Sequence, residues 1–184
     1  DPNIFASHDT DSVIAAYDQM IADPTEPLQN RAIGGDLYFP GSVFKLVVTA
    51  AAIQSGEYTP DSTFGNPAQL NLTGTSTPIY NSTRQECRGG EGDQVSLTNA
   101  LIYSCNIPFA ELGEQLGEDA IADQAAAFGY GESLQIPTAV TASTYPDGLS
   151  PDQLQLTSFG QYDVRVTPLQ VAMTTAAIAN DGEL

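Results

Sequence analysis

The chain reads Tyr38-Phe-Pro-Gly-Ser-Val-Phe-Lys-Leu-Val-Val-Thr-Ala-Ala-Ala-Ile53 across its most apolar segment. Residues 44–53 contain neither Gly nor Pro, which favours a helix over this run. Because the run is apolar on every side, we expect the helix to be buried all round. Pro40-Gly41 marks a turn before it, so the helix should begin close to Ser42.

Lys45 is the only lysine of the chain, and it lies inside this apolar run. Burial of an ammonium group is costly unless the group is paired or neutralised, and desolvation lowers its pKa. Ser42 precedes Lys45 by three residues, which places a hydroxyl and a potential base on one helical face beside unpaired N–H groups. A nucleophile, a base and part of an oxyanion hole would then share one turn. In the alternative interpretation, Ser42 only caps the helix and Lys45 reaches a surface carboxylate.

The rest of the chain predicts a mostly helical domain with few strands. Helical periodicity and end signals predict further helices at residues 11–22, 97–103, 107–116, 119–128 and 168–180. Residues 55–92 are rich in Gly, Pro, Thr, Ser and Asn, which predicts loops and small strands over a helical core. A chain of 184 residues makes one domain, and no internal repeat or linker divides it.

The composition argues against several classes of protein. The formal net charge of −18 disfavours nucleic acid and anionic membranes as partners, because both require clustered Lys and Arg. No glycine-rich phosphate loop with a following lysine is present, which disfavours nucleotide binding. His8, the single histidine, has neither an apolar nor a carboxylate setting, which disfavours a serine–histidine–acid triad.

Two cysteines and two Asn-x-Thr sequons are compatible with more than one structure. Cys87 and Cys105 suffice for one disulfide, and two reduced thiols are the alternative. They lack the partners that a structural zinc requires, so we expect no metal. Asn71-Leu-Thr and Asn81-Ser-Thr are compatible with glycosylation. Ser104-Cys-Asn106 offers a hydroxyl and an amide at a joint between two predicted helices, where a simple cap or turn would also place them.

Taken together, several ordered motifs resemble the transpeptidase domain of class B penicillin-binding proteins, with similarity to actinobacterial members. The motifs are Tyr38-Phe-Pro-Gly-Ser-Val-Phe-Lys45, Ser104-Cys-Asn106, Phe159-Gly-Gln-Tyr-Asp-Val-Arg-Val-Thr-Pro-Leu-Gln170 and Ala176-Ala-Ile-Ala-Asn-Asp-Gly182. Asp1-Pro-Asn3 and Leu28-Gln-Asn-Arg-Ala32 also resemble the family. The implied fold is α/β (α+β), that of serine β-lactamases and penicillin-binding transpeptidases. This segment would be mostly its helical region, with the main sheet strands largely outside the chain.

The resemblance implies a D,D-transpeptidase that cross-links peptidoglycan stem peptides ending in D-Ala-D-Ala. Ser42 would be the nucleophile and Lys45 its base. Ser104 would relay a proton to the leaving D-Ala amine, and Asn106 would bind the substrate amide and orient Lys45. β-Lactam antibiotics would acylate Ser42. Gly160-Gln161 and Thr167-Pro168 match a family segment that packs beneath the site. No cofactor is implied, and cell-wall synthesis or division proteins are the expected protein partners.

The family's third motif, a Lys-Thr/Ser-Gly strand that supplies an oxyanion N–H and carboxylate-binding groups, is expected after residues 176–182, yet the chain ends at Leu184. We therefore interpret residues 1–184 as an internal piece of a transpeptidase domain. Its location would be the outer face of the cell membrane, anchored by a segment not present here. A disulfide between Cys87 and Cys105 would then clamp a loop against the second motif.

Two rival functions remain at this stage. A serine β-lactamase or β-lactam sensor shares the fold and the Ser-x-x-Lys pair, but a hydrolase also needs a base for deacylation. Glu111, Glu114 and Glu132 have no diagnostic context for that role. A non-catalytic cell-wall interaction domain is the second rival.

Overall fold

The computed structural model of the protein describes residues 2–134 and 136–183. Its helices are η1 (Pro2–Ala6), α1 (Thr10–Ala22), η2 (Gly41–Phe44), α2 (Lys45–Ser55), α3 (Leu97–Ile102), α4 (Ile107–Leu116), α5 (Glu118–Ala127), α6 (Pro151–Thr157) and α7 (Pro168–Ala179). Its strands are β1 (Thr63–Gly65), β2 (Gln69–Asn71), β3 (Pro78–Tyr80) and β4 (Gln94–Ser96). β1 pairs antiparallel with β4 and β2 with β3. The described residues therefore form a largely helical body with small sheets, and the sequence prediction of that character is confirmed.

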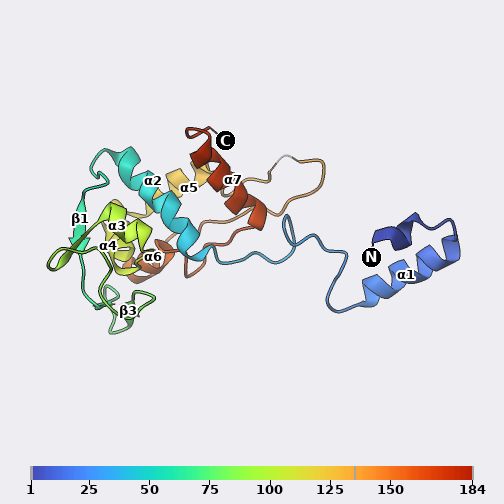
Figure 1. Ribbon diagram of the computed structural model, residues 1–184, viewed down its shortest axis with the longest axis horizontal. Coiled ribbons are helices and arrows are strands. Elements are labelled where there is room, and N and C mark those ends of the chain that lie inside the picture. The colour runs from blue at the N-terminus through green and yellow to red at the C-terminus, as the bar shows by residue number, and fades with distance from the viewer. Residues whose placement is uncertain (1, 135, 184) are drawn as a thin grey trace.

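Helix α4, which lies beside α3 in Figure 1, contacts α2, α3, α5, α6 and β1. Its side chains Ile107, Phe109 and Leu112 are fully buried. Pro108 lies in the first turn of α4, where its missing N–H has no intrahelical partner to lose. The resulting core fixes both ends of α4, and its N-terminal end follows the predicted site residue Asn106 directly.

The prediction that the helix after Ser42 is buried on every side is wrong. Phe44, Val47 and Val48 are fully buried against the core, whereas Ile53 on the same helix is 49% exposed. Helix α2 packs its inner face on α3, α4 and α5. Its other face lies toward the outside of the body in Figure 1, because a helix at the edge of a helical body has only one side against the core.

Helix α6 falls in a region that the sequence analysis treats as a loop. Ser150 accepts a hydrogen bond from the Gln153 backbone, and the Gln153 side chain accepts one from the Ser150 N–H, which is a capping box. Pro151 occupies the first turn. The Ser-Pro-Asp-Gln sequence is a helix-start signal that predicts α6 despite its short length.

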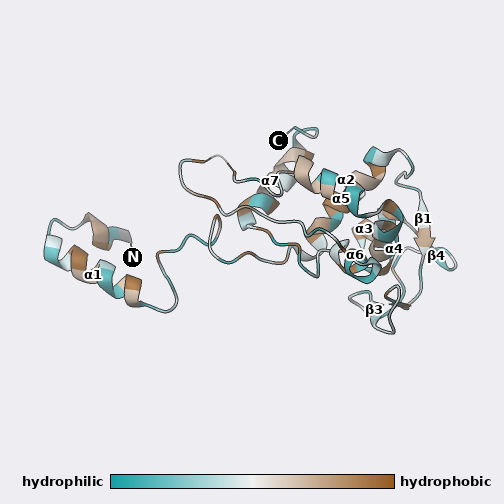
Figure 2. Cartoon of the chain, turned by 180° about the vertical axis from the view of Figure 1, so that it is seen from behind, coloured by the Kyte–Doolittle hydropathy of each residue, from teal (hydrophilic) through white to brown (hydrophobic). Residues whose placement is uncertain are grey.

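The N-terminal arm, residues 2–30, extends away from the helical body (Figure 1). Helix α1 begins after Asp9, whose carboxylate accepts a hydrogen bond from the Asp11 N–H. Its predicted amphipathic pattern is present, yet α1 has no buried residue, and its apolar positions appear as brown bands in Figure 2. A bilayer-spanning helix must be long and apolar, and no helix in the described part of the chain meets both conditions.

Candidate active site

Lys45 is fully buried, and its ammonium nitrogen lies at the meeting point of the predicted site residues. Nζ donates to the Asn106 Oδ1 at 2.9 Å and to the Ser104 carbonyl oxygen at 2.7 Å. It also lies 3.2 Å from both the Ser42 Oγ and the Ser104 Oγ. The alternative in which Lys45 reaches a surface carboxylate is wrong, since all of these partners are hydroxyl, carbonyl or amide oxygens.

Burial lowers the pKa of Lys45 from 10.5 to about 8. Desolvation disfavours the charged form, and no carboxylate among the described residues forms an ion pair with Lys45. At pH 7, about one unit below this pKa, about a tenth of the amine is neutral. A neutral amine accepts a proton, so Lys45 is suited to act as the base for Ser42.

Ser42 lies in the 3₁₀ helix η2, and the α-helix α2 begins at Lys45. The three-residue spacing predicts that Ser42 and Lys45 share the first turn of one α-helix. The tighter 3₁₀ turn achieves the same result, because side chains three residues apart eclipse each other in it. Ser42 is exposed while Lys45 is buried behind it, so the hydroxyl is accessible to a ligand and the amine is shielded from water.

Ser104 occupies the left-handed position of a Schellman turn that ends α3. Its φ is 54°. The Cys105 N–H bonds the Ala100 carbonyl at 2.9 Å, and the Ser104 N–H bonds the Leu101 carbonyl at 3.1 Å. Glycine is the usual residue at this position, because other residues are strained there by roughly 1 kcal/mol. The turn directs both the carbonyl and the hydroxyl of Ser104 to Lys45, so the predicted cap and the predicted site are the same structure.

Replacing Ser104 with glycine should separate these two roles. We expect the free energy of unfolding to rise by up to about 1 kcal/mol, because glycine adopts a positive φ without strain. The rate of Ser42 acylation should fall, because the hydroxyl near Lys45 is lost. Urea unfolding and acylation kinetics on Ser104→Gly and Ser104→Ala would test this, with Ser104→Ala retaining the strain. A Ser104→Gly protein less stable than Ser104→Ala would contradict this account of the turn.

Asn81 is a supporting residue that the sequence analysis does not identify. It is buried, and its Oδ1 accepts from the Asn106 N–H at 2.8 Å and from the Ile107 N–H at 3.1 Å. Its Nδ2 donates to the Gln85 carbonyl at 3.0 Å. The amide thus caps α4 from a distant loop and fixes Asn106. Because this amide is buried and hydrogen-bonded, its place in an Asn-x-Thr sequon does not make it a surface glycosylation site.

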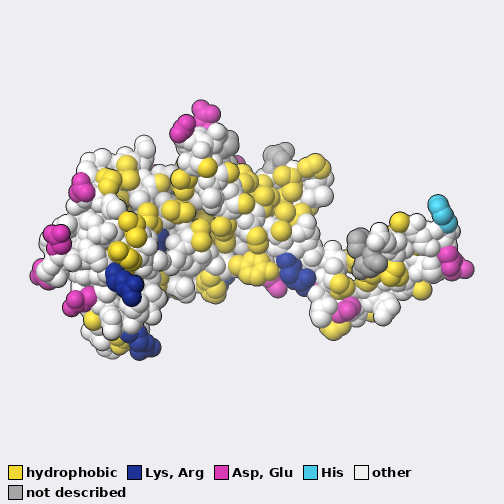
Figure 3. All heavy atoms as spheres, in the orientation of Figure 1, with side chains coloured by type: hydrophobic (Ala, Val, Ile, Leu, Met, Phe, Trp, Pro, Cys, Tyr) yellow, Lys and Arg dark blue, Asp and Glu magenta, His cyan; other side chains and the backbone are white. Residues whose placement is uncertain are grey.

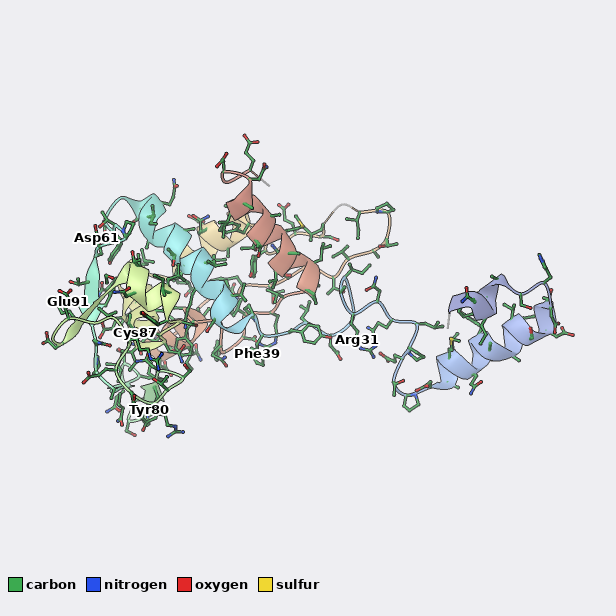
Figure 4. All side chains as sticks on the ribbon, viewed as in Figure 1. Arg31, Phe39, Asp61, Tyr80, Cys87 and Glu91 are labelled. Carbon is green, nitrogen blue, oxygen red and sulfur yellow. A yellow bond between two sulfur atoms is a disulfide. The ribbon has the colours of Figure 1, made fainter. Side chains whose placement is uncertain are left out.

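Cys87 and Cys105 form a disulfide, which decides between the two states that the sequence leaves open. Cys105 lies between Ser104 and Asn106, so the bridge ties the loop that contains Cys87, which is labelled in Figure 4, directly to the second motif. The Asn66 side chain holds the other side of this loop, accepting from the Cys87 N–H at 2.6 Å and donating to its carbonyl at 3.1 Å. Closing a loop of this separation, 18 residues, stabilises a fold by about 3 kcal/mol in the chain-entropy description.

Gly160 packs directly on the turn that carries Ser42. Its carbonyl accepts from the Gly41 N–H at 3.0 Å, and its φ is 81°. A Cβ at this position would lie 1.9 Å from the Gly41 carbonyl oxygen. The segment at Gly160 therefore supports the site from beneath, as the resemblance implies, but the next residue, Gln161, lies in the lining of the cavity itself.

A cavity of about 520 Å³ opens over Ser42. Its lining residues are Ser42, Pro78, Ile79, Tyr80, Asn81, Ser82, Arg84, Ser104, Asn106, Leu156, Phe159 and Gln161. This volume suits a peptide-sized or drug-sized ligand. The described lining contains hydroxyl, amide and apolar groups and one arginine, with no Asp or Glu.

The remaining candidates lie outside this cavity. Glu111 accepts from the Gly65 N–H at 3.1 Å, and burial raises its pKa. Glu114 accepts from the Gln155 Nε2 at 2.7 Å and the Thr73 Oγ1 at 2.9 Å, joining α4 to α6 and to the residues after β2. The histidine, cyan in Figure 3, lies on the N-terminal arm. No three His, Cys, Asp or Glu side chains gather as potential metal ligands in the part of the chain that is described.

Comparisons with known proteins identify the family of this chain. The family described as penicillin binding protein transpeptidase domain matches residues 4–184. The chain is 39% identical over 183 residues to peptidoglycan D,D-transpeptidase PbpA of Mycolicibacterium smegmatis, a match that covers 99% of this chain and 36% of that protein. The chain therefore spans little more than a third of this curated relative's length.

Solved structures show the same fold. A crystal structure of PBPA from Mycobacterium tuberculosis matches with a TM-score of 0.90 at 37% identity, over 99% of this chain and 42% of that one. The penicillin G acyl-enzyme complex of the same mycobacterial protein matches with a TM-score of 0.90 at 37% identity, over 99% of this chain and 41% of that one. The sequence match and the fold agree, and the chain belongs to the penicillin-binding protein transpeptidase family, among its class B members.

Proposed function

We propose that this chain carries the acylation centre of a peptidoglycan D,D-transpeptidase, with Ser42 as nucleophile and Lys45 as its base. The observation that carries the proposal is the buried Lys45 amine, which lies 3.2 Å from the Ser42 hydroxyl and has a pKa lowered to about 8 by burial. The relatives named D,D-transpeptidase and the β-lactam acyl-enzyme of the mycobacterial structure support the same chemistry.

The proposed reaction begins when neutral Lys45 takes the proton of the Ser42 hydroxyl. Oγ then attacks the carbonyl carbon of the penultimate D-Ala, and the bond from that carbon to the terminal D-Ala nitrogen breaks. The Ser104 hydroxyl, 3.2 Å from the Lys45 Nζ, relays the proton to the departing amine. An amine of a neighbouring stem peptide attacks the resulting ester, which forms the cross-link and returns the proton to Ser42.

Asn106 is placed to orient both partners in this reaction. Its Oδ1 accepts from the Lys45 amine, and its Nδ2 donates to the Tyr80 carbonyl at 2.9 Å. In our proposal the same amide contacts the backbone of the donor peptide. Groups for the terminal carboxylate are expected from the family's Lys-Thr/Ser-Gly strand, which lies beyond the matched motifs.

The composition of the cavity favours a transpeptidase over a β-lactamase. Deacylation by water needs a positioned base, and Glu111 and Glu114 are engaged elsewhere by Gly65, Gln155 and Thr73. The described lining of the cavity contains no carboxylate at all. We therefore expect a β-lactam ester on Ser42 to be long-lived.

The test is the intact mass of the purified protein after incubation with benzylpenicillin, followed by peptide mapping. We expect a lasting adduct on Ser42 that is absent from Ser42→Ala. Rapid hydrolysis of the drug with no lasting adduct would favour the β-lactamase. An unmodified protein, together with unchanged activity of Ser42→Ala in the cell, would instead favour the non-catalytic interaction domain.

The acylation rate should depend on the ionisation of Lys45. Because the neutral amine is the active form and its pKa is about 8, the rate constant should rise nearly tenfold per pH unit below pH 8 and level off above it. Stopped-flow acylation with a chromogenic cephalosporin from pH 6 to pH 10 would measure the profile. A rate that is independent of pH through this window would exclude Lys45 as the base.

We also propose that the protein works outside the cytoplasm, as one part of a transpeptidase domain. The Cys87–Cys105 disulfide supports this location, because disulfides persist in oxidising compartments. Alkylation of protein taken from cells, without prior reduction, should leave both cysteines unmodified. Alkylation of both cysteines would argue for a reducing compartment.

A further inference from the structure

Arg84 lines the cavity above Ser42 but has no part in the proposed reaction. Its guanidinium carbon lies 4.9 Å from the centre of the Tyr80 ring, and its backbone has a φ of 55°. The Arg84 N–H bonds the Asn81 carbonyl at 2.9 Å, so the residue is part of the turn whose first residue caps α4. Stacking on Tyr80 restricts the side chain before any ligand arrives.

The described lining of the cavity contains one arginine and no carboxylate although the chain is strongly acidic. The net charge is −18, and only five side chains are Lys or Arg. Lys45 lies behind the cavity and Arg84 lies in its lining, while the lining contains no carboxylate in the described residues. Figure 3 shows dark blue side chains at the end of the body where β3 lies. Arg84 belongs to no ion pair within residues 2–134 and 136–183, so its charge is available to an anionic ligand.

The position of Tyr80 indicates which part of a donor peptide would reach Arg84. The Tyr80 carbonyl accepts from the Asn106 side chain, and Asn106 is the proposed contact for the donor amide. That amide lies on the acyl side of the reacting carbonyl. The terminal D-Ala carboxylate lies on the opposite, leaving side. With the donor in this orientation, Arg84 would lie beside the residue that precedes D-Ala-D-Ala.

We propose that Arg84, stacked on Tyr80, is a specificity-determining residue that binds a free carboxylate on the side chain of the residue preceding D-Ala-D-Ala. The planar guanidinium accepts a carboxylate in a two-bond geometry that an ammonium does not provide. This inference rests on the proposed function for the orientation of the donor. It adds that the site prefers donors with an acidic residue at this position over donors with a neutral or basic one.

The preference can be measured without turnover, in the Ser42→Ala background. Two peptides, acetyl-Glu-D-Ala-D-Ala and acetyl-Gln-D-Ala-D-Ala, have nearly the same shape and differ in one charge. NMR titration should give about fivefold tighter binding of the Glu peptide, a difference typical of one accessible charge pair. Raising the salt concentration should reduce the difference in affinity between the two peptides, because salt screens the charge pair.

The effect should belong to Arg84 alone. Arg84→Gln should remove the preference for the Glu peptide and leave binding of the Gln peptide nearly unchanged. Arg84→Lys should keep only part of this preference. Arg88→Gln is the matched control, since Arg88 is in the same loop but lines a different pocket, beside the disulfide. An equal loss of the Glu preference in Arg88→Gln would show that the effect comes from net charge and would overturn the proposal. Equal binding of the two peptides by the Ser42→Ala protein without further changes would also overturn it.

Two further outcomes separate this inference from the proposed function. If Arg84→Gln weakens the binding of both peptides equally, Arg84 binds the terminal carboxylate and the proposed preference is wrong. If benzylpenicillin leaves Ser42 unmodified while the Glu preference depends on Arg84, the proposed acyl transfer fails and the binding preference is retained.

Discussion

Replacing Lys45 with methionine should lower the rate constant for acylation of Ser42 by about 10³-fold, the usual contribution of a positioned general base. Lys45 Nζ is the only described amine near the Ser42 hydroxyl, and its neighbours there are oxygens of Ser104 and Asn106. Lys45→Arg is the matched control, because it keeps a positive charge but does not release its proton at ordinary pH. We expect both variants to be equally slow, and a near-native rate in Lys45→Arg would show that charge alone is needed.

The same methionine variant should change how stability depends on pH. The folded-state pKa of Lys45 is about 8, below its ordinary 10.5, so the protonated amine destabilises the folded state below pH 8. This penalty is relieved as pH rises from 8 to 10.5. The parent protein should therefore gain about 3 kcal/mol of unfolding free energy relative to Lys45→Met across this window. Urea unfolding of both proteins at each end of the window measures the difference, and a constant difference would contradict the lowered pKa.

Replacing Gly160 with alanine should slow the acylation of Ser42 through a steric clash. The new Cβ would lie 1.9 Å from the Gly41 carbonyl oxygen, a backbone atom that moves only if η2 moves. A displacement of about 1 Å at Ser42 would slow acylation by about 10²-fold. The overpacked contact should also lower the free energy of unfolding by up to about 3 kcal/mol.

Gly56→Ala is the control for this substitution. Gly56 ends the same helix, α2, with a φ of 75°, and a Cβ there would meet nothing within 4 Å. The free energy of unfolding of Gly56→Ala should be lower by about 1 kcal/mol because of backbone strain, and its acylation rate should equal that of the parent protein. Acylation kinetics and urea unfolding of the two variants distinguish the effect of backbone strain from that of the clash with Gly41. An acylation rate of Gly160→Ala equal to that of the parent protein would refute the role of this contact.

The sequence predicts the helices where the pattern is local. The starts and ends of α4 and α7 agree within a residue or two with the expected 107–116 and 168–180, because apolar spacing and flanking Pro or Gly define them. The burial of α2 on one side only is not predictable in this way, since apolar composition does not indicate which face meets the core. Helix α6 is too short for its apolar periodicity to be recognised. The capping box at Ser150 is a local signal that does mark its start.

The residues of the candidate site likewise fall into those that local sequence predicts and those that it does not. Ser42 and Lys45 are three residues apart, so their proximity follows from helical geometry alone. Ser104 and Asn106 are identified only through the family resemblance, because their contacts with Lys45 join positions about 60 residues apart. The support from Asn81 and Gly160 depends on contacts between distant loops, and neither residue type indicates such a contact by itself.

The burial of the single lysine has a practical consequence for chemical labelling. Because Lys45 is the only lysine and is fully buried, the folded chain presents no lysine amine to reagents such as acid anhydrides or succinimidyl esters. Modification of Lys45 by such a reagent would therefore report opening of the site, at a rate set by how often the core around α2 becomes accessible. The mass spectrometry peak of the peptide that contains Lys45 would then measure how often the acylation centre opens.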